Sequence, residues 1–477
     1  MGNIQAQYPK SHWLVLSFLF AIRDVNRNPN LLPNVTLGYS VYENFGSARM
    51  TYNAMIDLAS SGQENIPNYS CGPPNTVLAV LENAATEISV LIANVMGIYK
   101  IPQISYAFVS HALQDEAQFP FLYRMFPNEE YLYPGILKLL RHFRWTWVGL
   151  IAPDTDNGER FLSTLTPMLT RNSICALFSL ILPQKVVENY LEDVLRSGFS
   201  SKWTRISVVI YYAETELAFF YGIYLVQSLV TEHLKLMEGK VWVTNAWWDL
   251  SSLSSRSVVP QENVQTFFSF LIRTNKQATY NKYHPFHITA EQLWRKAFRC
   301  SYSKHELAVR GWTRCMERRE LEIRPEAVLG DVHSGHGHSI YQAVHAVAQA
   351  LHAFYLSTSK SVVMAGGDKW SHQRIQRWKM YHFLKNFWLS NTSIEGVHLD
   401  EDGDLAADLD IVKSVTFPND SLDVRTIGNM KKTSSQGVLF NIDKDNRVWP
   451  RWIHQEIGKG LCKRSCAKVA NSMKNHA

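Results

Sequence analysis

Short apolar runs alternate with helical patterns along much of the 477-residue chain. Residues 145–152 are almost continuously apolar, which predicts a buried strand, and a turn rich in Asp, Asn and Gly separates this strand from a helix that begins at Glu159. Residues 206–212 and 241–244 predict two further buried strands, and a helical pattern lies between them at 214–231. Strand, turn and helix repeated in this order predict a parallel α/β architecture.

The same alternation extends to both sides of this segment. The further predicted elements are helices over residues 11–27, 82–97 and 339–355 and a strand over residues 101–106. Asn28-Pro29-Asn30 ends the first of these helices. Residues 399–410 are acidic and contain glycine, which is typical of a hairpin. The alternation is lost from residue 437 onward, and we expect no regular structure in the last fifteen residues.

The predicted sheet indicates where a ligand would bind. In open α/β sheets, ligands bind beyond the carboxyl ends of the strands, here the loops after Tyr106, Ala152, Tyr212 and Thr244. Polar residues near strand ends and helix starts are therefore candidate ligand contacts, although each of them could instead be a helix cap or a turn former. They are Thr86, Ser105, Ser110, Glu129, Asn157 and Asn245.

Composition and charge exclude several classes of protein. Apolar residues make up 46% of the chain and charged residues 19%, which is enough for a hydrophobic core. The net charge of +6 includes a basic C-terminal tail and forms no stripe that would neutralise phosphates, so a dedicated nucleic-acid binder is not expected. The longest clean apolar stretch, residues 13–22, has about half the ~20 residues of a membrane-spanning helix.

The sequence contains no common enzyme signature. There is no glycine-rich dinucleotide or phosphate loop, no nucleophile elbow and no HExxH motif. His333, His336 and His338 resemble a zinc site, but no carboxylate or cysteine is spaced to complete it, and we interpret them as a surface loop. Asp154 and Asp156 are interpreted as a turn and a helix start rather than as part of a calcium loop. We expect a non-enzymatic protein without a metal or cofactor.

Cysteines and glycosylation triplets bear on the compartment. Six cysteines without CxxC spacing favour neither a zinc ribbon nor a small disulfide scaffold. Four Asn-x-Ser/Thr triplets are candidate glycosylation sites and support a secretory route: Asn34, Asn68, Asn391 and Asn419.

Three longer motifs resemble the extracellular ligand-binding region of class C G protein-coupled receptors. They are Pro-Gln-Ile-Ser-Tyr at 102–106, Phe-Pro-Phe-Leu-Tyr-Arg-Met-Phe-Pro-Asn-Glu at 119–129 and His-Phe-Arg-Trp-Thr-Trp-Val-Gly at 142–149. Supporting stretches lie at residues 26–38, 97–102, 339–353 and 415–419. Within the class, these segments are similar to those of vomeronasal type-2 (pheromone) receptors.

The resemblance implies a bilobed, periplasmic-binding-protein-like fold, the Venus flytrap, with two parallel-sheet α/β lobes. Lobe 1 would comprise residues 1–127 and 256–395, lobe 2 residues 128–255 and 396–460, and residues 461–477 the start of a cysteine-rich neck and a tail. A ligand would bind in the cleft between the lobes. Closure would rearrange a homo- or heterodimer formed through lobe 1, and a seven-helix bundle would carry the signal to a G protein.

The resemblance also implies roles for cleft residues. Thr86 matches a hydroxyl that grips the carboxylate of an amino acid, and Glu129 matches an acid that grips the ammonium. The usual serine is missing from Ala107-Phe108-Val109. Asn157 and Asn245 occupy the positions of an aromatic residue and an acid, respectively. These departures favour a peptide over a free amino acid, although a small amino-acid-like ligand remains an alternative.

By the same resemblance, Cys300 and Cys315 form a disulfide within lobe 1. Cys175 matches a cysteine that bonds into the neck, and the pairing of the remaining cysteines is left open: Cys71, Cys462 and Cys466. The family's signal peptide, most of its neck and its membrane bundle have no counterpart, so we expect a truncated receptor ectodomain on the extracellular side of the plasma membrane. The alternatives are a secreted flytrap binding or decoy protein and a non-functional fragment.

Overall fold

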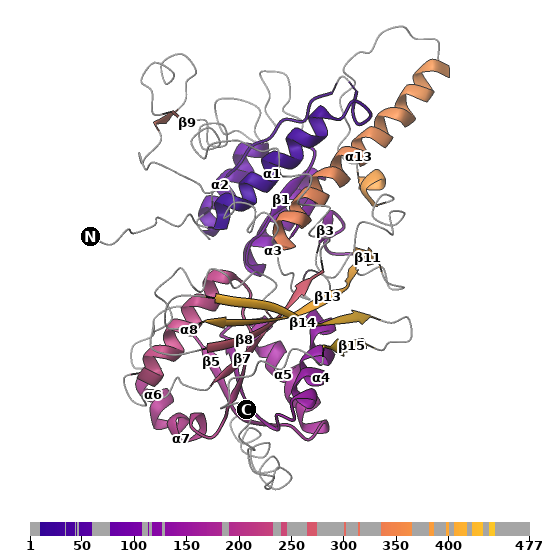
Figure 1. Cartoon of the computed structure of the whole chain (residues 1–477). Helices are drawn as coiled ribbons and strands as arrows, with labels where there is room; N and C mark the ends of the chain where they lie inside the picture. The colour runs from indigo at the N-terminus through magenta and orange to yellow at the C-terminus, as the bar shows by residue number, and fades with distance from the viewer. Residues whose placement is uncertain are drawn as a thin grey trace, which may run out of the picture. The chain divides into compact units, whose positions relative to one another are not determined.

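The computed structural model describes two compact units (Figure 1). Met1–Phe126 and Thr274–Leu405 belong to unit 1, and Pro127–Arg273 and Ala406–Ala477 belong to unit 2. The residues that the structure describes are 10–33, 35–42, 44, 47–59, 77–106, 113, 117–125, 129–183, 190–231, 240–245, 265–273, 300–301, 313–314, 335–364, 381–385, 397–399, 405–416, 422–432 and 438–443.

Unit 1 contains a three-stranded parallel sheet in the order β1-β2-β3. Its strands are β1 (Val80–Glu82), β2 (Gln103–Ser105) and β3 (Leu122–Arg124), and its helices include α1 (Lys10–Arg27), α2 (Ala48–Ala59), α3 (Thr86–Tyr99) and α13 (Gly335–Met364). Two-stranded sheets pair β9 (Cys300–Ser301) with β10 (Thr313–Arg314), and β11 (Val397–Leu399) with β12 (Leu405–Ala407).

Helices α1 and α13 lie side by side in unit 1 (Figure 1). Phe20 of α1 packs against Tyr341 of α13, with their ring centroids 5.8 Å apart. Asp24 of α1 accepts a hydrogen bond from the Tyr341 hydroxyl and lies 3.3 Å from His345 Nε2. The two segments are therefore joined by polar contacts as well as by apolar packing.

Unit 2 is built around one eight-stranded sheet in the order β15-β14-β13-β8-β7-β6-β4-β5. Its strands are β4 (Trp147–Pro153), β5 (Cys175–Leu182), β6 (Val208–Tyr211), β7 (Val241–Thr244), β8 (Gln265–Ile272), β13 (Leu409–Thr416), β14 (Leu422–Lys432) and β15 (Val438–Ile442). Strands β5, β4, β6, β7 and β8 are parallel, whereas β13 pairs antiparallel with β8, β14 with β13, and β15 with β14.

The helices of unit 2 cover both faces of this sheet, which explains the continuous apolar runs of its central strands. They are α4 (Leu132–His142), α5 (Asp156–Arg171), α6 (Tyr190–Arg196), α7 (Phe199–Trp203) and α8 (Glu216–Thr231), with a short 3₁₀ turn at Glu129–Tyr131. Trp242 and Phe267 pack with Trp203 in a core cluster that includes α6, α7 and α8. On the other face, Tyr212 stacks on Phe161 of α5.

The structure confirms the α/β fold class with parallel-strand sheets. It also confirms the helix predicted at 11–27 and the buried strands predicted at 145–152, 206–212 and 241–244, although the bounds of the first two strands differ by a few residues. The acidic segment 399–410 contributes to the pairing of β11 with β12, as a hairpin requires. Three antiparallel strands at one edge of the large sheet were not predicted.

Several element bounds predicted from the sequence are wrong. Glu82 ends strand β1 instead of starting a helix, and α5 begins at Asp156 because Thr155 caps it. Helix α13 begins at Gly335, so His336 and His338 lie in its first turn and not in a loop. Strand β15 lies in the segment after residue 437 where the alternation of strands and helices was expected to be lost, and the last fifteen residues lie outside the described part of the chain.

The division into units also differs from the predicted lobe boundaries of 256 and 395. Strand β8 pairs with β7 and β13 in the sheet of unit 2, so the chain leaves this unit after Arg273. It returns at Ala406. None of the helices that the structure describes is both long enough and apolar enough to be a membrane span.

Candidate ligand-binding site

The carboxyl end of the small sheet in unit 1 gathers several polar side chains. Strands β1 and β2 pair in parallel, with Glu82 beside Ser105. Helix α3 begins at Thr86, and its N-cap residue Ala85 has no side chain that could cap it. Two of the residues singled out in the sequence, Thr86 and Ser105, therefore lie near the same edge of this sheet.

Glu82 is the central group of this edge. Its carboxylate accepts hydrogen bonds from the Ala84 N–H (2.7 Å), from Ser89 Oγ (3.0 Å) and from Gln103 Nε2 (3.1 Å). Burial raises the pKa of Glu82 above its ordinary value, and these hydrogen bonds counteract that rise only in part. No cationic side chain among the described residues forms an ion pair with it.

Three neighbours of Glu82 complete the edge. Gln103 Oε1 and Ser105 Oγ are buried and have no hydrogen-bond partner among the described residues. The Ser105 hydroxyl still helps to hold down the pKa of Glu82, although its geometry falls short of a hydrogen bond. Burial raises the pKa of Tyr106, and the charge of Glu82 raises it further. The edge is thus rich in oxygen acceptors.

In unit 2, the end of strand β4 is tied to the start of helix α5. Thr155 Oγ1 accepts a hydrogen bond from the Gly158 N–H (3.0 Å) and donates one to Glu214 Oε1 (2.7 Å). A Cβ atom at Gly158 would overlap the carbonyl oxygen of Pro153, so this position requires glycine. Thr155 therefore links the loops that follow two neighbouring strands of the sheet, β4 and β6.

Asn245 lies directly after strand β7 and is almost fully buried. Its Oδ1 accepts from the Ala213 N–H (2.9 Å), and its Nδ2 donates to the Ala213 carbonyl (3.0 Å). Both ends of the amide are thereby bound to main chain that follows β6. Asn157, in the first turn of α5, is also buried.

The structure thus places Ser105 and Asn245 at strand ends, and it places Thr86 and Asn157 in the first turns of helices α3 and α5. Glu129 begins the 3₁₀ turn, but its side chain is not described. The remaining candidates lie outside the described residues: Ala107, Phe108, Val109 and Ser110.

Sequence reasoning missed Glu82, Gln103, Thr155 and Glu214 as polar residues of these edges. An acid directly after the apolar run at 77–81 was the available signal for Glu82, but the helical pattern that follows obscured it. Glu214 gave no such signal, because it meets Thr155 from 59 positions away in the chain.

The predicted disulfide and glycosylation sites are largely outside the described residues. Strand β9 pairs with β10, which puts Cys300 beside Thr313, but Cys315 is not described and the bond stays a prediction. Cys175, at the start of β5, is disulfide-bonded. The four glycosylation candidates are not described: Asn34, Asn68, Asn391 and Asn419. The described residues contain no group of three or more His, Cys, Asp or Glu side chains that could hold a metal ion.

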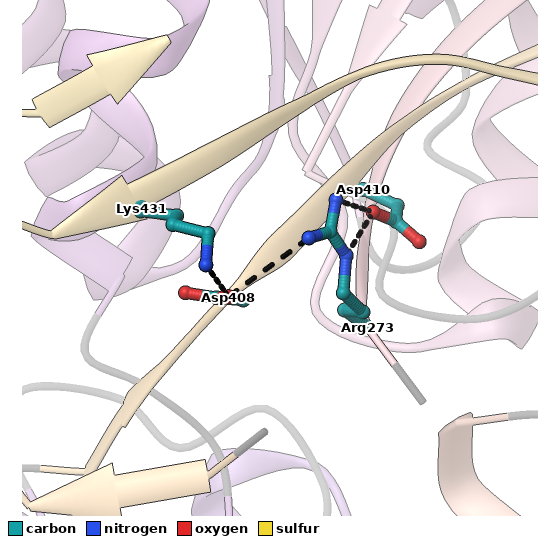
Figure 2. A network of polar contacts seen from close by, with 4 residues as sticks. All are labelled: Arg273, Asp408, Asp410 and Lys431. Carbon is teal, nitrogen blue, oxygen red and sulfur yellow. Dashed lines mark hydrogen bonds and ion pairs between the residues drawn. The ribbon is translucent and has the colours of Figure 1, made fainter. Parts of the chain in front are cut away.

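A second polar network lies where the chain leaves and re-enters unit 2 (Figure 2). Arg273 follows β8, and its main-chain N–H donates to the carbonyl of Asp408 (2.8 Å). Its guanidinium contacts Asp410, and Asp408 in turn lies 2.6 Å from Lys431 Nζ of β14. The network joins three adjacent strands at the position of both crossings.

Comparison with known proteins agrees with this architecture. Residues 14–416 match the receptor family ligand-binding region, and the chain belongs to this family. Its relatives place it in the branch formed by the extracellular ligand-binding domains of class C receptors. The resemblance found in the sequence motifs is therefore confirmed.

Three relatives illustrate the match. Vomeronasal type-2 receptor 26 of Mus musculus is 29% identical over 80% of this chain and 44% of that receptor. The extracellular calcium-sensing receptor of Homo sapiens is 24% identical over 95% of the chain and 44% of that receptor. G-protein coupled receptor family C group 6 member A of Carassius auratus is 29% identical over 51% of the chain and 28% of that receptor. The chain thus spans less than half the length of these curated relatives.

Proposed function

We propose that this chain binds an extracellular ligand as the ligand-binding region of a class C chemosensory receptor of the vomeronasal type. It acts by binding and not by catalysis. The observation that carries the proposal is the family match across residues 14–416, together with buried polar groups at the carboxyl ends of both parallel sheets. Ligands of parallel α/β proteins bind at this end of the strands.

The proposed ligand is a peptide, with a small amino-acid-like molecule as the alternative. By the resemblance, Glu129 would grip the ammonium group of a free amino acid, and lobe 2 would contribute a further acid. Asn245 occupies the position of that further acid, and both polar atoms of its side chain are bound to Ala213. This favours a ligand that is recognised through more contacts than the two charged groups of an amino acid.

Signalling would follow the scheme of the class. The ligand binds between the two units, the units close on it, and a dimer formed through unit 1 rearranges. The signal then passes to a G protein through the seven-helix region of a full-length receptor. In this scheme the chain lies on the extracellular side of the plasma membrane, whereas a secreted binding protein would use the same fold without a membrane region.

A tryptophan fluorescence titration of the expressed chain tests ligand binding. The probes are the twenty amino acids and a library of short synthetic peptides, and we expect saturable changes with peptides alone. Glu129→Ala is compared with Glu130→Ala. Glu130 is a suitable control because it is the adjacent glutamate and forms an exposed ion pair with Arg160. Saturable amino-acid binding that only Glu129→Ala abolishes would contradict a peptide ligand, and an absence of saturable binding would contradict the proposal.

A chimaera separates the receptor from the secreted protein. The chain replaces the corresponding region of mouse vomeronasal type-2 receptor 26, and peptide-evoked calcium release is recorded in cells. A response supports the receptor function. If the chain binds peptide but the chimaera reaches the cell surface and gives no calcium response, the secreted protein is favoured. A stop codon after Ala477 in every mature transcript would favour it as well.

A further inference from the structure

Three oxygen-bearing side chains meet between β1, β2 and α3 in unit 1: Glu82, Gln103 and Ser105. Glu82 and Ser105 are partners in the parallel ladder, and Gln103 lies two residues before Ser105 on the same face of β2. Their exposed fractions are 7%, 1% and 0%. Together they form an oxygen cluster inside the unit, at the carboxyl end of its sheet.

The hydrogen bonds of this oxygen cluster leave several acceptor positions open. Gln103 Nε2 donates to Glu82 Oε1 (3.1 Å) and to the Ser89 carbonyl (3.2 Å), which fixes the orientation of the amide and leaves Oε1 without a donor. Ser105 Oγ has no partner among the described residues. Glu82 accepts three hydrogen bonds and retains capacity for about one more. Each unfilled position is an acceptor lone pair, which a hydrogen-bond donor or a cation can occupy.

We propose that Glu82, Gln103 and Ser105 hold a small cation, either a sodium ion or the ammonium group of an organic ligand. Carboxylate, amide and hydroxyl oxygens are the ligands that hard cations prefer, and an ammonium group would donate to the same atoms. The carboxylate has no cationic side chain paired with it among the described residues. A cation would therefore neutralise a buried charge and fill two empty acceptors at once.

This cation site does not depend on the proposed receptor function. A neutral water molecule could donate to the same two acceptors, but it would leave the charge of Glu82 uncompensated. Because burial already raises the pKa of Glu82, a cation would stabilise the ionised carboxylate against that effect. A water molecule and a cation in this site therefore differ in a measurable property. Only a bound cation makes folding stability depend on which cation is in solution.

Thermal unfolding of the full chain tests the site in chlorides of equal ionic strength. The cations are sodium, methylammonium and choline, and choline is the reference because it is bulky and has no N–H donor. We expect the unfolding midpoint to be about 3 °C higher in one of the first two salts than in choline. A rise in sodium identifies a metal ion, and a rise in methylammonium alone identifies a ligand ammonium. Equal midpoints in all three salts would overturn the proposal.

Three variants tie the effect to these residues. Glu82→Gln removes the charge and should abolish the rise, whereas Glu87→Gln makes the same change at an exposed position of α3 and should retain it. Ser105→Ala removes a hydroxyl without a partner, so it should fold at least as well in choline and show a smaller rise. A rise retained in both Glu82→Gln and Ser105→Ala would exclude the site, and Ser105→Ala alone decides if Glu82→Gln does not fold.

Discussion

Arg273 and Asp410 are joined across strands β8 and β13 by a forked contact, with Nε and Nη2 of the arginine 2.8 and 2.7 Å from Asp410 Oδ1 (Figure 2). Arg273 is the last residue of unit 2 before the chain crosses to unit 1, and Asp408 follows its return. Because Lys431 binds Asp408, the contact continues into β14. The network therefore holds both crossing segments in register within unit 2.

Removing one charge of this network should destabilise unit 2. Asp410→Asn should lower the free energy of unfolding by about 1 kcal/mol, because the pair is only partly exposed and makes two contacts. Glu192→Gln, which breaks the exposed pair with Arg196, is the control and should cost about 0.3 kcal/mol. Urea unfolding measures both, and equal losses would show that the network adds nothing beyond an ordinary surface pair.

Asn245 and Asn26 offer a matched test of burial. Each amide side chain makes two hydrogen bonds to one residue's main chain, Asn245 to Ala213 and Asn26 to Leu37, but Asn245 is buried and Asn26 is exposed. Asn245→Ala should cost about 3 kcal/mol, since it leaves a buried N–H and C=O unpaired, whereas water can replace the bonds of Asn26 and Asn26→Ala should cost about 1 kcal/mol. Denaturant unfolding compares them, and a cost at Asn245 no larger than at Asn26 would contradict the structure.

Two helical glycines should respond to alanine in opposite directions. A Cβ at Gly158 would overlap the Pro153 carbonyl, so Gly158→Ala should lower the free energy of unfolding by about 2 kcal/mol or more. Gly97 in α3 has nothing within 4 Å of its added Cβ, and Gly97→Ala should raise that free energy by about 0.5–1 kcal/mol through helix propensity. Thermal unfolding of the two variants measures the signs, and a Gly158→Ala protein as stable as wild type would refute the close approach.

Much of the large sheet could be predicted because helices cover both its faces. Strands β6 and β7 then consist of apolar residues apart from the final Thr244, and this pattern is visible in the sequence. Strand β14 was missed because it carries Arg425 and Lys431 near the margin of the sheet and so lacks such a run. Strand β1 has three residues and runs into a helical pattern, so its last residue, Glu82, was assigned to the helix.

The candidate site was predicted only in outline. A sequence shows which polar residues follow strands, and Ser105 and Asn245 were found in this way. It does not show which partners they meet: Asn245 is bound to Ala213 through tertiary hydrogen bonds, and Thr155 meets Glu214 across two loops. The function of a polar residue at a strand end depends on these partners, so it could be assigned only once the fold was known.

The pH dependence of stability should report on Glu82 directly. Burial raises its pKa in the folded chain above the ordinary value of 4.5, so the folded state holds this proton more tightly than the unfolded state. The stability that protonated Glu82 contributes is fully present below about pH 4.5 and is lost as the pH rises through the raised pKa. Tyr106, the titratable group that interacts with Glu82, has its own pKa raised and stays neutral across this range.

Choline chloride supplies no cation that the oxygen cluster could bind. In this salt, the free energy of unfolding of wild type should fall as the pH rises above 4.5, and Glu82→Gln should not show this fall. The difference in free energy of unfolding between variant and wild type should grow in favour of the variant as the pH rises, because glutamine cannot ionise. Glu87→Gln, which changes an exposed acid, should follow the wild-type profile. Urea unfolding at a series of pH values measures the three curves. A Glu82→Gln curve parallel to that of wild type would mean that Glu82 titrates as it does in the unfolded chain, which its burial does not allow.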